Sequence, residues 1–298
     1  MRKKITAVLL VATMLLTSGV TVFADRVDAV IDKPYLALGA DLSPQEQMTV
    51  LSLLGLSDIN VDDYDIISIT NADEHEYLDK YLDASIIGTR ALSSVLVVGK
   101  EAGNGIHVTT KNISYCTEGM YRNALLTAGI EDADITVAGP FSISGTAALV
   151  GAIKAYETMT GEEIDDENLD AANDELVLTG KLVEDIGDSE KAEDLMALVK
   201  QEVAENKLTS AEDIQNVVDQ ACDQLDIQLS EENQKQIAEL MKKIEGLDLD
   251  VDKLKDQAKD LYQKLEDLDF HVDKESVGNF FTRIIDAIVN FFQGLFGK

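Results

Sequence analysis

Few side chains in this 298-residue chain have the types and spacing that catalysis requires. Cys116 and His107 have the composition of a nucleophile and its base, but the sequence assigns no Asn or Asp to orient the ring. Ser144 precedes a predicted helix whose backbone N–H groups are able to stabilise an anion, although plain N-capping is the favoured role for this residue. There is no Gly-x-Ser-x-Gly elbow. The sequence therefore predicts no catalytic residue.

A metal or cofactor site finds equally little support. Asp166, Asn168 and Asp170 have the opening spacing of a calcium-binding EF-hand loop, but Ala171 and Val177 stand where that loop needs Gly and Glu. The three His are well separated. We predict no metal and no cofactor, with weak calcium binding by clustered carboxylates as the alternative.

The two cysteines, Cys116 and Cys222, lie far apart, in different predicted domains. We expect two buried thiols. A disulfide between Cys116 and Cys222 is the alternative, because export would place the chain in an oxidising environment.

Charge and composition limit the classes of partner. The chain has 25 Lys+Arg against 56 Asp+Glu, a net charge of −31, so it has no basic surplus with which to bind nucleic acid. Hydrophobic residues make up 45% of a length that accommodates one or two domains, each with its own core.

The first 24 residues predict export. Arg2, Lys3 and Lys4 precede a short apolar stretch, and Val22-Phe23-Ala24 suits signal peptidase. We expect cleavage between Ala24 and Asp25, which makes the mature protein secreted or associated with the cell surface. An uncleaved membrane anchor is the alternative.

The region 25–161 is predicted to be an α/β domain. Strands are expected at 35–38, 66–69 and 134–137, and a hairpin at 94–98 and 106–110. Helices are expected after the cap residues Ser43, Thr70 or Asn71, Thr117 and Ser144.

A shift of 74 residues aligns several of these signals without a gap. It places Ser43 on Thr117 and Gly55 on Gly129, two caps and two helix stops. This favours a duplicated strand–helix–strand–helix unit, with chance recurrence of ordinary α/β signals as the alternative.

Five stretches carry a resemblance to a known family. They are Leu38-Gly39-Ala40-Asp41-Leu42-Ser43, Gly88-Thr89-Arg90-Ala91-Leu92-Ser93-Ser94, Met120-Tyr121-Arg122-Asn123-Ala124-Leu125, Thr127-Ala128-Gly129 and Ser144-Gly145-Thr146-Ala147-Ala148-Leu149. In these the chain resembles domain-of-unknown-function family 1002, the YpuA-like exported proteins of Gram-positive bacteria. The resemblance implies export and an α/β core with a helical remainder. It implies no catalytic residues, because the family has no assigned activity.

The second half is predicted to be acidic and helical. Residues 162–180 are expected to form an acidic linker, and 181–275 a helical bundle or coiled coil. Apolar residues recur there at alternating steps of three and four, which is the heptad pattern; they are Ile237, Leu240, Ile244, Leu247, Val251, Leu254, Ala258, Leu261, Leu265 and Leu268. Gly246 interrupts the pattern, and a closed bundle is favoured over an intermolecular coiled coil.

The last segment, 276–298, is predicted to be an amphipathic helix. Its apolar face consists of Phe280, Phe281, Ile284, Ile285, Ile288, Val289, Phe292, Leu295 and Phe296. Such a face suits a membrane interface or a partner, and docking onto the protein's own core is the alternative.

Together these features predict a binding or structural module of the cell envelope or extracellular space, with an unidentified envelope partner. The alternative is an envelope hydrolase whose site is assembled from residues distant in the sequence. A deep pocket with converging Asp, Glu, His or Ser side chains would favour the enzyme.

Overall fold

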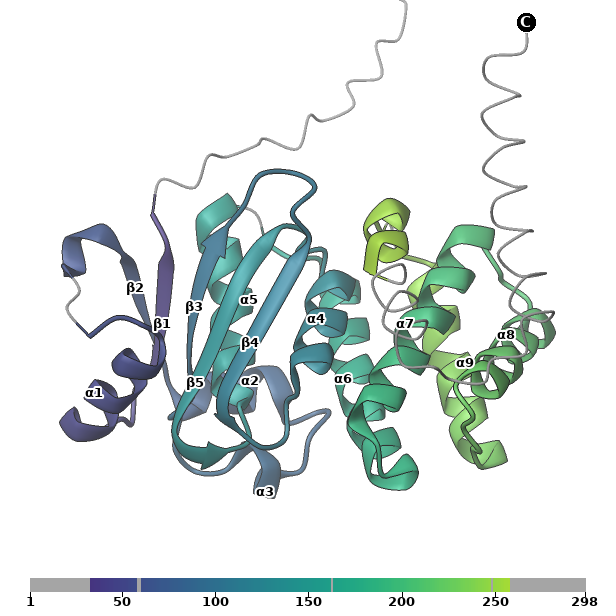
Figure 1. Cartoon of the computed structure of the whole chain (residues 1–298), viewed down its shortest axis with the longest axis horizontal. Coiled ribbons are helices and arrows are strands. Elements are labelled where there is room, and N and C mark those ends of the chain that lie inside the picture. Colours follow the sequence, from purple (N-terminus) through teal and green to yellow (C-terminus); the bar gives the residue numbers. More distant parts are fainter. Residues whose placement is uncertain (1–32, 58–59, 162, 248, 258–298) are drawn as a thin grey trace, which may run out of the picture.

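The computed structural model describes residues 33–57, 60–161, 163–247 and 249–257. A mixed sheet with helices on both faces is followed by a helical half (Figure 1). This confirms the predicted order of an α/β region and a helical remainder. The strands of the described chain are β1 (Tyr35–Gly39), β2 (Asp65–Ile69), β3 (Ser94–Gly99), β4 (Ile106–Ile113) and β5 (Ala133–Ile143).

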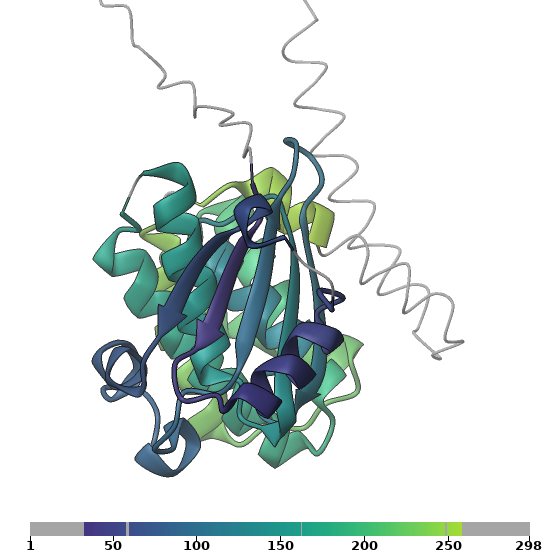
Figure 2. The ribbon, with the colours of Figure 1, turned by 90° about the vertical axis from the view of Figure 1, so that its left-hand side faces the viewer.

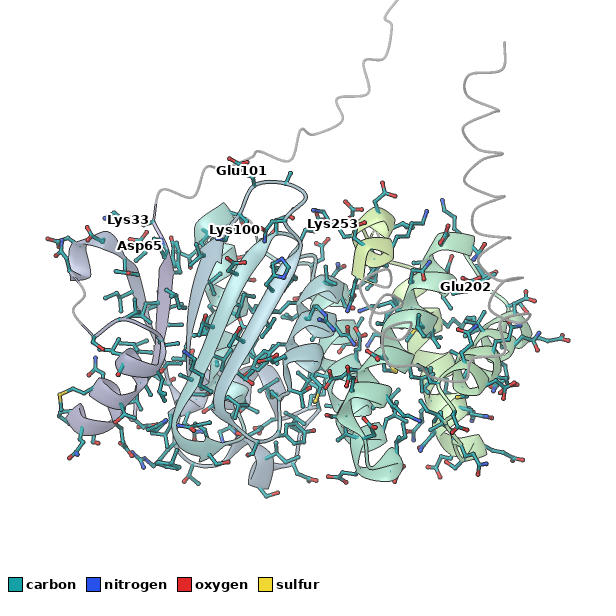
Figure 3. All side chains as sticks on the ribbon, in the orientation of Figure 1. Lys33, Asp65, Lys100, Glu101, Glu202 and Lys253 are labelled. Carbon is teal, nitrogen blue, oxygen red and sulfur yellow. The ribbon has the colours of Figure 1, made fainter. Side chains whose placement is uncertain are left out.

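The sheet has the strand order β2-β1-β3-β5-β4. β1 is parallel to β2 and β4 is parallel to β5, whereas β3 is antiparallel to both of its neighbours. Consequently β1, β2, β4 and β5 all run in the same direction, and their carboxyl ends meet at one edge of the sheet. This edge lies at the bottom of Figure 1, beside α3. In Figure 3, Lys100 and Glu101 mark the loop at the opposite edge.

The expected hairpin is wrong. The strands at 94–99 and 106–113 exist, but β5 lies between them, because β4 forms a parallel pair with β5. A parallel pair needs a crossover connection, and α4 (Glu118–Thr127) supplies it.

The first half also contains shorter and longer helices around the sheet: α1 (Pro44–Leu53), the 3₁₀ turn η1 (Val61–Asp63), α2 (Asn71–Leu78), α3 (Ala84–Ile87) and α5 (Thr146–Thr160). Ser43, Thr70 and Thr117 are N-caps as predicted, each accepting a hydrogen bond from a backbone N–H three residues later.

Ser144 is not a cap, contrary to expectation. Gly145 takes the N-cap position of α5 with φ of +100°, a conformation that suits glycine. A Cβ at Gly145 would also lie 2.6 Å from the Tyr121 hydroxyl oxygen. The chain therefore enters α5 through a tight glycine turn and not through a serine cap.

Helices cover opposite faces of the sheet. α5 packs on the face that contains Ala37, Val95 and Val137, and α1 packs on the face that contains Leu36 and Ala138 (Figure 2). The second face has the smaller core, since α1 is the main helix that contributes to it.

The structure does not confirm the duplicated unit. The 74-residue shift does relate the bounds of α1 to those of α4. It does not relate their positions, because α1 lies over one face of the sheet and α4 packs with the core of the other face.

The helical half consists of α6 (Asp166–Ile186), α7 (Ser189–Asn206), α8 (Ala211–Gln224) and α9 (Glu231–Glu245), with a further helical turn at 251–257. Helices α6, α7, α8 and α9 share one apolar core, as a bundle does. α9 ends before Gly246, so no single rod follows the heptad pattern through the described residues.

The predicted acidic linker 162–180 is wrong for most of its length. From Asp166 onward it is the start of α6, which buries Ala171, Ala172 and Leu176 while its carboxylates face outward or form ion pairs. The many acidic residues of this segment drew attention away from its apolar residues, which recur at helical spacing and form the buried stripe of α6.

Several predictions lie outside the described residues: the signal peptide with Ala24 and Asp25, the heptad positions from Ala258 onward, and the apolar face between Phe280 and Phe296. Within the described part of the chain, no helix is both long and apolar enough to cross a membrane.

Candidate functional site

The carboxyl edge of the sheet holds an open cleft of about 450 Å³. In sheets with parallel strands this edge is where ligands usually bind, and the volume is that of a small-molecule site. The cleft is bordered by α2, α3, the loop before β3, and the ends of β4 and β5; its lining residues are Glu74, Ser85, Ile86, Ile87, Gly88, Thr89, Arg90, Leu92, Ser93, Ser114, Tyr115, Phe141, Ile143, Ser144 and Thr146.

One wall of the cleft, residues 88–93, is fixed against the end of β1. The backbone N–H of Ala91 donates to Asp41 Oδ2 (2.8 Å), and the Gly39 N–H donates to Ser94 Oγ (3.1 Å). A Cβ at Gly39 would lie 2.4 Å from the carbonyl oxygen of Ala91, so only glycine permits this approach.

A second contact ties the same wall to α5. Ser93 Oγ accepts a hydrogen bond from the Ala148 N–H (2.9 Å). The start of α5 is also held by α4, because the Tyr121 hydroxyl donates to the Gly145 carbonyl (2.6 Å). Stretches that carry the family resemblance, around Gly39, Arg90, Tyr121 and Gly145, thus meet at or beside the cleft.

Arg90 lies at the rim and is already engaged. Its Nη2 donates to the Asp41 carbonyl (2.8 Å) and to Glu46 Oε2 (2.9 Å). Hydrogen bonds from Ser43, reinforced by Arg90, lower the pKa of Glu46 to about 2, so this ion pair persists at neutral pH. The arrangement makes Arg90 a brace for the wall at residues 88–93.

The carboxyl group of Glu74 is the most unusual group in the cleft. Glu74 is only 1% exposed, and it accepts hydrogen bonds from Thr146 Oγ1 (2.7 Å) and Asn71 Nδ2 (3.1 Å). No Lys, Arg or His within the described ranges forms an ion pair with it. Burial raises the pKa of Glu74 above its ordinary value, and the two hydrogen bonds offset part of that rise.

Hydroxyl groups extend from Glu74 along the floor of the cleft. Thr146 Oγ1 donates to Glu74, and Ser144 Oγ lies 3.2 Å from Thr146 Oγ1. Among the described residues that line the cleft, Glu74 is the only carboxylate, and there is no His or Cys. The arrangement therefore accepts hydrogen bonds well, but it contains neither a nucleophile–base pair nor two facing carboxylates.

A second buried glutamate lies where α4, α6 and α7 meet. Glu175 and Lys200 are both fully buried and form an ion pair, with Lys200 Nζ 2.9 Å from Glu175 Oε1. Lys200 also donates to the Asn123 carbonyl (2.9 Å) and to Thr127 Oγ1 (3.1 Å). Desolvation lowers the pKa of Lys200, and the carboxylate beside it opposes that change. None of the cavities described in the molecule is lined by this pair.

The structure does not bring together the two pairs considered from sequence, Cys116 with His107 and Cys116 with Cys222. Cys116 and Cys222 are free thiols buried in different cores, which confirms the expected thiols and leaves no disulfide between them. Burial raises the pKa of Cys116 to about 12 and that of Cys222 to about 11, so neither is an activated nucleophile. The His107 ring is exposed and lies 3.0 Å from the Asn104 carbonyl oxygen.

The residues with the spacing of an EF-hand do not form a calcium-binding loop in the structure. Asp166, Asn168 and Asp170 lie on helix α6 and not in a loop. Asp170 is neutralised by Lys80 (2.5 Å) and by Lys243. The described residues contain no group of three or more His, Cys, Asp or Glu side chains arranged to hold a metal ion.

Glu74 was missed by sequence reasoning, although a signal was present. With Thr70 as N-cap, Glu74 is the fourth helical residue and lies one turn before Leu78, which is 1% exposed. A glutamate on the buried stripe of a short helix is uncommon and points to a special environment.

Comparisons with known proteins agree with the resemblance seen in the sequence. The family described as "Protein of unknown function (DUF1002)" matches residues 38–261. "Uncharacterized protein YpuA" of Bacillus subtilis (strain 168) is 39% identical over 271 residues, which cover 89% of this chain and 92% of that protein. No solved structure matches the chain.

Proposed function

The chain belongs to the DUF1002 family, and we propose that it is an exported binding protein whose ligand occupies the cleft at the carboxyl edge of the sheet. The observation that carries this proposal is Glu74, a buried carboxyl group that borders an open cleft without a cationic partner. Buried charges in proteins are normally paired, so an unpaired one beside a cavity suggests a partner that comes from outside.

The lining of the cleft favours binding over hydrolysis. A glycosidase of the usual kind needs two carboxyl groups on either side of the bond, and a serine hydrolase needs a base beside its hydroxyl. The described lining supplies one carboxyl group, several hydroxyls and no imidazole. The envelope hydrolase therefore has less support than the binding module.

Export is the second component of the proposal. It is supported by the basic residues before the short apolar stretch and by the small residue Ala24 at the expected cleavage point. Sequencing the amino terminus of protein recovered from the medium or the cell wall tests it. A mature chain that begins at Asp25 supports export, and a cytoplasmic chain that begins at Met1 contradicts it.

Photocrosslinking in intact cells tests the binding function directly. A photoreactive residue at Thr89, on the exposed rim of the cleft, should capture the ligand or partner, and one at Gln47, on the exposed face of α1, should not. The substitution Ser85→Trp, which fills the cleft from α3, should abolish capture from Thr89. The matched substitution Ser52→Trp on α1 should leave it intact. Equal capture from both positions, or capture unaffected by Ser85→Trp, would contradict the proposal.

A further inference from the structure

We propose that the cleft binds the primary ammonium group of a small ligand, with Glu74 as its counterion. The proposal rests on the binding function proposed above and specifies the chemistry of the ligand. It starts from the difference between two buried glutamates, Glu74 and Glu175.

Glu175 and Glu74 are buried to the same degree, at 0% and 1% exposure. The fold gives Glu175 an internal cation, Lys200, and seals both of them. It gives Glu74 only a hydroxyl and an amide as donors, and leaves it at the wall of an open cleft. His75, the neighbouring residue on α2, lowers the pKa of Glu74 through its charge, but its ring is bonded to Asp79 (2.5 Å) and forms no ion pair with Glu74. The place that Lys200 takes beside Glu175 is therefore open beside Glu74.

The surroundings of Glu74 suit an ammonium group better than a metal ion. A metal ion needs several anionic or carbonyl ligands held at fixed distances, and the described lining supplies one carboxylate. An ammonium group has three N–H donors and needs three acceptors. Glu74 supplies one, and the hydroxyl oxygens of Ser144 and Thr146 lie in the same part of the cleft.

The other residues that line the cleft indicate the chemistry of the rest of the ligand. Ile86, Leu92 and Ile143 give it apolar walls, and Phe141, 50% exposed, offers ring surface at the opening. A ligand of this class has a primary amine on a compact body with some apolar or ring surface, such as an amino sugar or the amino end of a short peptide.

The test uses pairs of probes that differ in the charged amine. Glucosamine is compared with glucose, and alaninamide with N-acetylalaninamide, by titration of the ¹⁵N-labelled mature protein while the backbone amide signals of 88–93 and 144–148 are followed. Wild-type protein should bind each amine at least about tenfold more tightly than its neutral counterpart, since a charge-assisted hydrogen bond is worth that much. Glu74→Gln should remove this preference.

The matched control is Asp73→Asn. It changes the charge of the neighbouring residue on α2 by the same amount, but Asp73 is paired with Lys154 outside the cleft. This variant should keep the full preference for the amines. Loss of the preference in both variants would show that only the overall charge of α2 matters, and would overturn the proposal.

Each other result also decides the question. If glucose and N-acetylalaninamide move the same signals with equal affinity, the cleft is a binding site but its preference for an ammonium group is disproved. If Glu74→Gln retains the preference, Glu74 is not the counterion. If none of the four probes moves these signals, the amine proposal fails, and the photocrosslinking at Thr89 decides separately whether the cleft binds anything.

Discussion

Glu175 and Glu74 are both buried carboxyl groups, but their surroundings differ in a way that separates structure from function. At the junction of α4, α6 and α7, Glu175 is enclosed with Lys200, which supplies its counterion from within the protein. At the carboxyl edge of the sheet, Glu74 is equally buried but accepts hydrogen bonds from a hydroxyl and an amide group and forms no ion pair with a described residue, and it lines a cleft. The comparison shows that burial of a charge does not by itself indicate a site. The indication comes from burial, an absent counterion and an adjoining cavity in combination.

The junction is therefore expected to be structural. α4 belongs to the β4–β5 crossover, whereas α6 and α7 belong to the helical half, so the Glu175–Lys200 pair joins the two halves of the chain. Disrupting the junction should affect folding, and altering the cleft should affect binding.

The largest expected effect is at the junction. Lys200→Met leaves Glu175 buried without a cation and should lower the free energy of unfolding by about 3–5 kcal/mol. The double variant Glu175→Leu with Lys200→Met should recover most of this loss, because no uncompensated charge remains. Urea unfolding of both variants measures the difference. Equal losses in the single and double variants would show that the pair acts through its packing and not through its charge.

The next effect concerns the frame of the cleft. Gly39→Ala places a Cβ against the backbone of Ala91 and should cost about 1–3 kcal/mol while displacing the wall at 88–93. Gly246→Ala is the matched control, because Gly246 has φ of −70° and its Cβ would meet nothing closer than 3.5 Å. Unfolding of the two variants in urea checks this. A Gly39→Ala protein as stable as Gly246→Ala would mean that the wall is not held as described.

A smaller effect should appear in acid, at the neighbour of Glu74. Hydrogen bonds from Lys154 and Thr70 lower the pKa of Asp73 to about 2, so its stabilising contribution is complete above the ordinary value near 4 and is lost as the pH falls towards 2. Asp73→Asn should cost about 1 kcal/mol at neutral pH, and the difference from wild type should disappear between about pH 4 and pH 2. Denaturant unfolding at a series of pH values measures it, and a difference that does not change with pH would contradict the assigned ion pair.

Local signals in the sequence anticipated much of the fold. The cap residues Ser43, Thr70 and Thr117 each open a helix, and the strand at 35–38 lies within one residue of β1. Partners in the sheet were not predictable in this way, because β3 and β4 are adjacent in sequence while β5 separates them in space. The prediction of a linker at 162–180 failed for a different reason. Acidic residues dominate the composition of this segment, but its apolar residues determine how α6 packs.

The site depends on long-range contacts to a greater degree than the fold does. Glu74 meets Thr146, and the wall at Ala91 meets Asp41, only once the sheet has formed. The helical stripe of Glu74 and Leu78 was readable from sequence, but the absence of a cation beside Glu74 was not, since any lysine of the chain was a candidate partner before the fold was known.

The most direct test of the central claim compares Glu74→Gln with Glu175→Gln at pH 7 in urea unfolding. Burial raises the pKa of Glu74, so the folded state favours its protonated form, and stability falls as the pH rises from the ordinary glutamate value towards neutral. The neutral glutamine should therefore leave the free energy of unfolding unchanged or raise it, whereas Glu175→Gln should lower it by about 3 kcal/mol because Lys200 loses its counterion. Should Glu74→Gln lower stability as much as Glu175→Gln does, Glu74 is a structural group like Glu175, and its assignment to a binding site is contradicted.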